Sequence, residues 1–157
     1  MELNKKVANF TLQTDEEKTA SLTDYAGRPV ILFFYPRADT PGCTIEACGF
    51  RDAFKKLQAA GAVVLGISRD TPRDQAKFRA KYKLPYTLLA DVDEKVCKQF
   101  GVLKEKNMYG KTVWGIERTT FVIGPDQTLL HIFPKVTPAG HAEEVLALLN
   151  AWKKAHK

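Results

Sequence analysis

The most apolar run in the chain is the stretch VILFFY at residues 30–35, which no charged or amide side chain interrupts. A strand with one face in water alternates apolar and polar residues, whereas a strand covered on both faces is apolar throughout. Residues 63–67 (VVLGI) have the same character. The two runs therefore predict interior strands of a sheet that is covered on both of its faces.

Helices are predicted between these strands and after them. Apolar positions recur at helical spacing over residues 43–60, and Gly61 ends that helix. The sequence Asp70-Thr71-Pro72 opens a second helix that runs to about residue 82. The remaining expected elements are a hairpin over residues 7–21 that turns at 14–17, strands over 87–90, 119–123 and 129–133, and helices over 91–100 and 141–155.

The resulting order is a hairpin followed by β, α, β, α, β, α, β, β and α. Strands that alternate with helices predict an α/β protein, and a β-β-α unit after a β-α-β unit is typical of the thioredoxin-like fold. We therefore expect a central mixed sheet flanked by helices, with an N-terminal β-hairpin. The length of 157 residues fits a single domain that spans residues 1–157.

The net charge and the lengths of the apolar segments restrict the possible functions. The net charge of +6 comes from scattered lysines and arginines, without the charge block or the motif of a nucleic-acid-binding protein. No apolar run is long enough to span a bilayer, and the first residues lack the apolar core of a signal peptide. We therefore expect a cytoplasmic protein without nucleic-acid or membrane partners. In that reducing compartment a pair of cysteines is more often catalytic, redox-sensing or metal-binding than structural.

Two of the three cysteines lie in the segment PRADTPGCTIEAC, residues 36–48, which follows the first interior strand. Cys43 falls in the first turn of the predicted helix, where unpaired backbone N–H groups and the helix dipole stabilise negative charge. The thiolate is the reactive form of cysteine. Thr40 can direct its hydroxyl at a molecule that approaches the sulfur, while Pro36 and Pro41 stiffen the loop. The segment therefore predicts a reactive thiol.

Cys48 lies five residues after Cys43 in the same predicted helix. In a regular α-helix this spacing gives a Cα–Cα distance of roughly 8.6 Å, whereas a disulfide needs less than about 7 Å. A disulfide between the two residues therefore requires local unwinding of the helix. The alternative is that Cys48 is a small apolar residue of the core.

At these residues the chain resembles the peroxiredoxins. The stretch from Pro36 to Cys43 matches their P-x-x-x-T-x-x-C signature, and the stretch from Cys43 to Cys48 matches the C-x-x-x-x-C of the bacterioferritin-comigratory-protein, or PrxQ, branch. Residues 21–25, 66–70 and 115–123 are similar to that branch as well. The resemblance covers almost the whole chain, and its active-site signature is specific.

The resemblance implies a thiol-dependent peroxidase, an antioxidant enzyme that reduces hydrogen peroxide and organic hydroperoxides. Cys43 would be the peroxidatic cysteine, whose thiolate attacks the hydroperoxide and becomes a sulfenic acid. Thr40 would hold the peroxide oxygens, and Pro36 would shield the thiolate. Arg118 would place a fixed cation beside the sulfur and stabilise charge on the departing oxygen.

Cys48 would then be the resolving cysteine, which closes an intramolecular Cys43–Cys48 disulfide that a thioredoxin-type dithiol donor reopens. The resemblance implies no cofactor or metal, because the cysteine itself carries the electrons, and it implies a monomer. Cys97 complicates this assignment, since some members of the branch use a cysteine from such a region as the resolver. Because Val96 and Phe100 mark the buried stripe of its helix, we expect Cys97 to be structural.

Other classes of protein fit the sequence less well. A thioredoxin-like dithiol carrier needs C-x-x-C and a proline directly before the strand that begins at Thr119, and the chain has neither. A zinc site needs short paired spacings of Cys and His, and a Cys–His hydrolase needs a marked histidine for Cys43. Arg118 could also be a surface cation paired with Glu117 or Asp126. A chaperone-like role would survive the loss of the Cys43 thiol, whereas the peroxidase would not.

Overall fold

The structure, a computed structural model, describes residues 1–156. Within that range one large sheet is built from β1 (Thr11–Thr14), β2 (Thr19–Ser21), β3 (Val30–Phe34), β4 (Val63–Ser68), β5 (Thr87–Ala90), β8 (Thr119–Ile123) and β9 (Leu129–Phe133). The strands lie in the order β2-β1-β5-β4-β3-β8-β9. β4 is parallel to both β3 and β5, whereas the other neighbours are antiparallel. The sheet is therefore mixed, as the sequence predicted.

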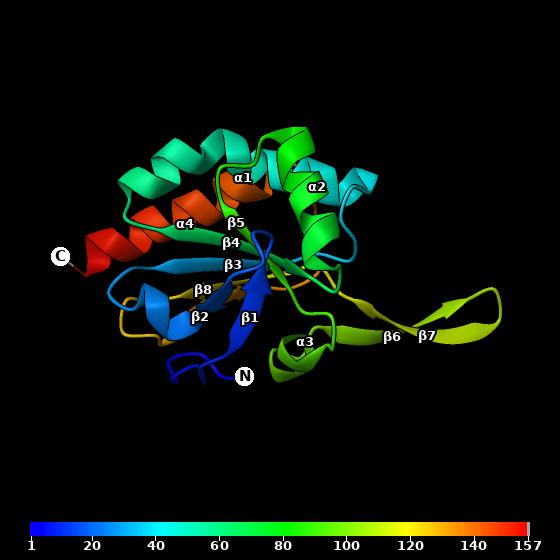
Figure 1. Ribbon diagram of the computed structural model, residues 1–157. Helices are drawn as coiled ribbons and strands as arrows, with labels where there is room; N and C mark the ends of the chain where they lie inside the picture. Colours follow the sequence, from blue (N-terminus) through cyan, green and yellow to red (C-terminus); the bar gives the residue numbers. More distant parts are fainter. Residues whose placement is uncertain (157) are drawn as a thin grey trace.

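Helices cover both faces of this sheet (Figure 1). α1 (Pro41–Ala59), α2 (Pro72–Tyr82) and α4 (His141–Ala155) lie on one face. α3 (Lys95–Gln99), the short 3-10 helix η1 (Leu22–Tyr25) and the N-terminal segment lie on the other. The predicted α/β architecture with its N-terminal hairpin is confirmed. Among residues 1–156, each helix is too short or too polar to cross a membrane.

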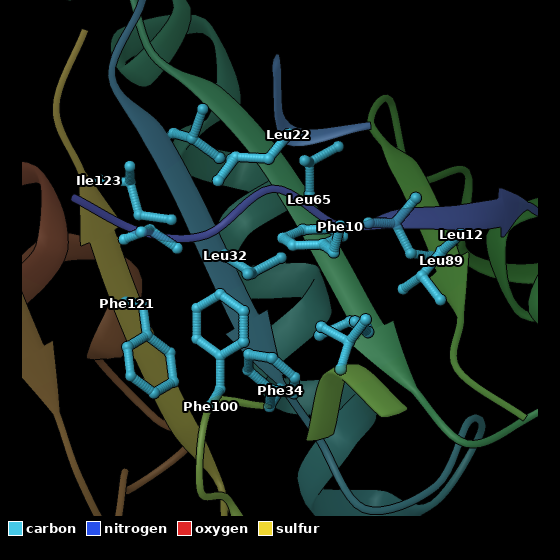
Figure 2. Packing of buried hydrophobic residues seen from close by; sticks show 14 of the residues in the cluster. Phe10, Leu12, Leu22, Leu32, Phe34, Leu65, Leu89, Phe100, Phe121 and Ile123 are labelled. Atoms are coloured by element: carbon cyan, nitrogen blue, oxygen red, sulfur yellow. The ribbon is translucent and has the colours of Figure 1, made fainter. Parts of the chain in front are cut away.

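β3 lies inside the sheet between β4 and β8, and its side chains are buried on both faces. Phe34 lies in one apolar cluster, which we name the α3-side core, and Phe33 lies in the other, which we name the α1-side core. Figure 2 shows the α3-side core, where Phe34, Phe100 and Phe121 come together and the rings of the last two lie 4.8 Å apart. The continuous apolar run of the sequence is thus explained by a strand with a core on each side.

Two helices begin at positions that differ from the expected ones. α1 begins at Pro41 rather than at Cys43, because Thr40 takes the N-cap position and proline suits the first helical position. α3 begins four residues after Asp91, the expected start. The buried Asp91 carboxylate instead accepts hydrogen bonds from the backbone N–H groups of Val96 (3.2 Å) and Cys97 (2.6 Å). The residues from Asp91 to the helix therefore form a turn that caps α3.

A second hairpin was not predicted. β6 (Leu103–Met108) and β7 (Lys111–Ile116) form a separate two-stranded sheet that extends away from the main body (Figure 1). The backbone φ is 54° at Tyr109 and 76° at Gly110, the pair of positive values that a tight hairpin turn requires. Most of its side chains are exposed on both faces. No apolar face therefore marks these strands in the sequence.

Candidate active site

Cys43 lies at the N-terminus of α1. Thr40 is the N-cap residue with extended backbone (φ −97°, ψ 158°), and Cys43 is the third helical residue, with 1% of its surface exposed. The N–H of Thr44 makes the first helical hydrogen bond, to the carbonyl of Thr40 (2.9 Å). The N–H groups of the first turn are therefore without helical partners, and with the helix dipole they favour negative charge at the Cys43 sulfur.

Hydrogen bonds fix the loop that leads to Cys43. Asp39 has a left-handed backbone (φ 60°), and its carboxylate accepts from Nζ of Lys81 (2.9 Å) and Oη of Tyr82 (2.7 Å) at the end of α2. These two bonds, the Lys81 bond first, lower the pKa of Asp39. The N–H of Ala38 donates to Oδ2 of Asp70 (2.8 Å), two residues after β4. The loop is therefore tied both to α2 and to the end of β4.

Thr40 and Pro36 lie in this loop and are half-buried. The hydroxyl of Thr40 donates to the carbonyl of Arg37 (2.8 Å) rather than capping the helix, so its oxygen can still accept a hydrogen bond. Pro36 lines a cavity of about 340 Å³ together with Arg37, Arg69 and Asp70. The structure thus brings Thr40 to the helix terminus and Pro36 to the rim of a neighbouring cavity.

Arg118 comes directly before β8 and reaches Cys43 from across the chain. Its Nη1 lies 3.4 Å from Sγ of Cys43 and 2.9 Å from Oε1 of Glu46. Burial works against the Arg118 cation, but Cys43 and Glu46 outweigh that effect and raise its pKa. The alternative of a surface cation paired with Glu117 or Asp126 is wrong, since the ion pair of Arg118 is with Glu46.

Gly42 leaves room for this guanidinium. A Cβ atom on Gly42 would lie 3.0 Å from Nη2 of Arg118 and 3.6 Å from Cγ of Pro138. Nearly all real Cβ contacts are longer than the first of these distances. The absence of a side chain at position 42 therefore lets Arg118 approach the start of α1.

Sequence reasoning missed Glu46. Its carboxyl group lies one turn after Cys43 on α1, and the residue is 1% exposed. Burial raises the pKa of Glu46 to about 7, although the hydrogen bond and charge of Arg118 oppose this shift. The spacing of three residues puts Glu46 on the helix face of Cys43 and could have marked it. A charged residue, however, is normally expected on a solvent-exposed face.

Cys48 is half-buried on the same helix. Both cysteines belong to the continuous helix α1, so their Cα atoms are roughly 8.6 Å apart by helical geometry, beyond the reach of a disulfide. The carbonyl of Ala47, next to Cys48, accepts a buried hydrogen bond from Oη of Tyr86 (2.6 Å). The thiols are therefore kept apart by an intact helix that is anchored from outside.

Cys97 lies in the α3-side core and is 0% exposed, whereas Cys43 lies in the α1-side core on the opposite face of the sheet. Burial first, and the nearby Asp91 carboxylate second, raise the pKa of Cys97 well above its usual range. The structure thus brings Cys43, Thr40 and Arg118 together and holds Cys97 apart. Across residues 1–156, no three His, Cys, Asp or Glu side chains are grouped so that they could hold a metal ion.

Comparisons with known proteins match nearly the whole chain. The sequence model of the AhpC/TSA family matches residues 3–132. A Coxiella burnetii protein classed as a bcp peroxiredoxin is 51% identical over 149 residues, which cover 95% of this chain and 99% of that protein. The peroxiredoxin Bcp of Escherichia coli K12 is 44% identical over 147 residues, which cover 94% of this chain and 92% of the relative.

Solved structures agree with these sequence matches. The chain superposes on a mutant of Xylella fastidiosa PrxQ with a TM-score of 0.93 and 36% identity over 98% of both chains. It superposes on the bacterioferritin comigratory protein of Xanthomonas campestris with a TM-score of 0.87 and 41% identity over 90% of both chains. The Xanthomonas structure was described in connection with alkyl peroxide reduction.

Proposed function

The chain belongs to the AhpC/TSA family as a peroxiredoxin of the Bcp/PrxQ branch, a thiol-dependent peroxidase, and we propose that Cys43 is its peroxidatic thiol. One observation carries this assignment: the guanidinium of Arg118 contacts Sγ of Cys43 (3.4 Å) at the N-terminus of α1. A helix terminus and a fixed cation both stabilise a thiolate. Cys43 therefore has the surroundings of a nucleophile.

The proposed first step is attack of the Cys43 thiolate on the distal oxygen of a hydroperoxide. A sulfur–oxygen bond forms, the O–O bond breaks, and the other oxygen leaves with the electron pair and takes a proton. Cys43 becomes a sulfenic acid. Arg118 stabilises the charge on the leaving oxygen, Thr40 orients the peroxide, and Pro36 shields the thiolate.

The proposed substrates are hydrogen peroxide and organic hydroperoxides. The alkyl peroxide reduction described for the Xanthomonas relative supports the organic class. The half-buried Thr40 and Pro36 lie in the loop that leads to Cys43, where either peroxide would approach the sulfur. No cofactor takes part in this scheme, because the sulfur itself is oxidised and reduced.

The proposed second step is attack of the Cys48 thiolate on the sulfenic sulfur. A sulfur–sulfur bond forms, the S–O bond breaks, and the departing hydroxide takes a proton and becomes water, which leaves a Cys43–Cys48 disulfide. Both cysteines lie in the helix α1, so its first turns must unwind for the sulfur atoms to meet. A thioredoxin-type dithiol reopens the disulfide by thiol–disulfide exchange. Such donors belong to reducing compartments, and we propose a cytoplasmic protein that acts as a monomer.

Peptide mapping without reductant, after one equivalent of hydrogen peroxide on the reduced protein, tests this scheme. We expect a Cys43–Cys48 linkage in the wild-type protein and none in Cys43→Ser. In Cys48→Ser we expect a sulfenic acid at Cys43 that a specific reagent can trap. A Cys43–Cys97 linkage would reassign the resolving residue, and three unreacted thiols would contradict the role of Cys43.

A further inference from the structure

Glu46 and Cys43 share one guanidinium group. Nη1 of Arg118 donates to Oε1 of Glu46 (2.9 Å) and to Sγ of Cys43 (3.4 Å). The side chain of Glu46 is 0% exposed and that of Arg118 is 15% exposed. One cation therefore faces two groups that can each carry a negative charge, in surroundings where water cannot stabilise the excess.

The second oxygen of Glu46 indicates which charge state the site accommodates. Within residues 1–156, Oε2 of Glu46 is buried and has no hydrogen-bond partner. A buried carboxylate is stable when hydrogen bonds satisfy both of its oxygens. A neutral carboxyl group tolerates an unpartnered oxygen better than an ionised one does. The surroundings of Oε2 therefore favour a protonated Glu46.

We propose that Glu46 is a positioning residue that shares one proton with Cys43, so that Glu46 is neutral while Cys43 is a thiolate and ionised once Cys43 is a sulfenic acid. The inference rests on the proposed role of Cys43 as the peroxidatic thiol. In both states the cluster of Cys43, Glu46 and Arg118 carries no net charge. Arg118 pairs with the thiolate before the reaction and with the Glu46 carboxylate after it.

The proton affinity of Glu46 suits this role. Burial raises the pKa of Glu46 to about 7 against the opposing effect of Arg118. Near neutral pH the group can therefore both hold a proton and release it.

The chemical step balances with this proton. The Cys43 sulfur bonds to the distal oxygen of the hydroperoxide, the O–O bond breaks, and the leaving oxygen carries away the electron pair. Glu46 gives up one proton while the leaving oxygen gains one, so that RS⁻ + RCOOH + R′OOH gives RSOH + RCOO⁻ + R′OH. The reaction therefore takes no proton from the solvent.

Three further titratable groups act on this cluster. Tyr35, which follows β3, interacts with Cys43, and burial raises the pKa of Tyr35 well above its usual range. Tyr86, which lies just before β5, interacts with Glu46, and burial raises the pKa of Tyr86 well above its usual range. His141, the first residue of α4, interacts with Arg118, and burial lowers the pKa of His141. All three side chains are therefore neutral near neutral pH.

Proton uptake during sulfenic acid formation tests the proposal. Cys48→Ser stops the reaction at the sulfenic acid, and a pH indicator in a weakly buffered stopped-flow experiment counts protons. With Glu46 present we expect no net proton uptake, although ultraviolet absorbance shows that Cys43 begins as a thiolate. In Cys48→Ser/Glu46→Gln we expect an uptake of one proton for each sulfenic acid formed. Cys48→Ser/Glu105→Gln, which changes an exposed carboxylate on β6, is the matched control and should behave like Cys48→Ser.

The outcomes separate this inference from the proposed function. Sulfenic acid at Cys43 with the same one-proton uptake in Cys48→Ser and in Cys48→Ser/Glu46→Gln would overturn the shared proton and leave the peroxidase intact. The absence of any sulfenic acid at Cys43 would overturn both. A starting thiol, rather than a thiolate, in the protein with Glu46 would also overturn the proposal.

Infrared difference spectroscopy gives an independent measurement that does not require proton counting. In Cys48→Ser we expect the C=O band of a protonated carboxyl group to disappear when one equivalent of peroxide oxidises Cys43. The double variant Cys48→Ser/Glu46→Gln should lack this change in the C=O band, and Cys48→Ser/Glu105→Gln should retain it. A carboxyl band that is absent before oxidation, or unchanged by it, would contradict the proposal without reference to any rate.

Discussion

Cys43 and Cys97 lie on opposite faces of the seven-stranded sheet, in the α1-side core and the α3-side core respectively. A disulfide between them would require a segment of chain to pass around or through the sheet. Cys48, by contrast, lies in the same helix as Cys43 and therefore on the same side of the sheet. The fold therefore favours Cys48 as the partner of Cys43.

The first prediction concerns Cys97→Ala. We expect the Cys43–Cys48 linkage to form at the wild-type rate, because Cys97 lies in the other core. Loss of the buried sulfur should lower the free energy of unfolding by about 1–2 kcal/mol. Peptide mapping and urea denaturation measure the two effects. A slower or missing linkage in a folded variant would make Cys97 a participant.

The second prediction concerns Gly42→Ala. The new Cβ would lie 3.0 Å from Nη2 of Arg118, so the guanidinium must shift by a few tenths of an ångström and its contact with Cys43 is disturbed. We expect the rate constant for reaction with peroxide to fall roughly tenfold, equivalent to about 1.4 kcal/mol. Gly49→Ala is the matched control, because its Cβ would meet Cβ of Ala142 at an ordinary 3.7 Å. Equal rates in the two variants would show that the position of Arg118 does not limit the reaction.

The third prediction concerns Tyr86→Phe. The hydroxyl of Tyr86 donates to the carbonyl of Ala47 (2.6 Å) and so anchors the part of α1 that must unwind. Without this bond, worth about 1 kcal/mol, closure of the disulfide after sulfenic acid formation should be about fivefold faster. Stopped-flow measurement of the second phase checks this, with Tyr25→Phe in η1 as the control. An unchanged second phase would mean that unwinding does not limit closure.

The fourth prediction concerns the ion pair between Arg118 and Glu46. Arg118→Met should slow the reaction with peroxide roughly 10²–10³-fold, because a preorganised charge is lost. It should also destabilise the fold by about 1–3 kcal/mol, because the buried carboxyl group of Glu46 loses its hydrogen-bond donor. Adding Glu46→Gln should restore stability but not the rate. A double variant that regains peroxidase activity would exclude a direct role of Arg118 in catalysis.

The fifth prediction concerns the pH dependence of stability. Folding raises the pKa of Glu46 from the ordinary 4.5 to about 7, because burial disfavours the carboxylate. Between these values the folded protein holds a proton that the unfolded chain has released. The stability from that proton is complete below pH 4.5 and is lost as the pH rises through about 7. The wild-type protein should lose about 3 kcal/mol over this range relative to Glu46→Gln, as measured by urea denaturation. If the free energies of unfolding of the wild-type protein and Glu46→Gln changed with pH in parallel, the raised pKa of the buried Glu46 would be contradicted.

Much of the fold could be predicted because its signals are local. The apolar run at residues 30–35 indicated a doubly covered strand, and Thr40-Pro41 carries the chemistry of a helix start. The hairpin of β6 and β7 could not be predicted. Its residues are exposed on both faces, so the alternation that marks a half-buried strand is missing. Its turn at Tyr109-Gly110 also lacks the common Asn-Gly or Asp-Gly pair.

By itself the sequence determined where Cys43 sits, since a cysteine in the first turn of a helix follows from spacing and capping over a few residues. It also determined that Cys48 can reach Cys43 only if that helix unwinds. Only the tertiary structure decided that Arg118, 75 residues away along the chain from Cys43, contacts both Cys43 and Glu46. Only the tertiary structure decided that Cys97 lies on the face of the sheet opposite to Cys43. Burial and charge balance depend on contacts between distant segments, and periodicity within one segment does not reveal them.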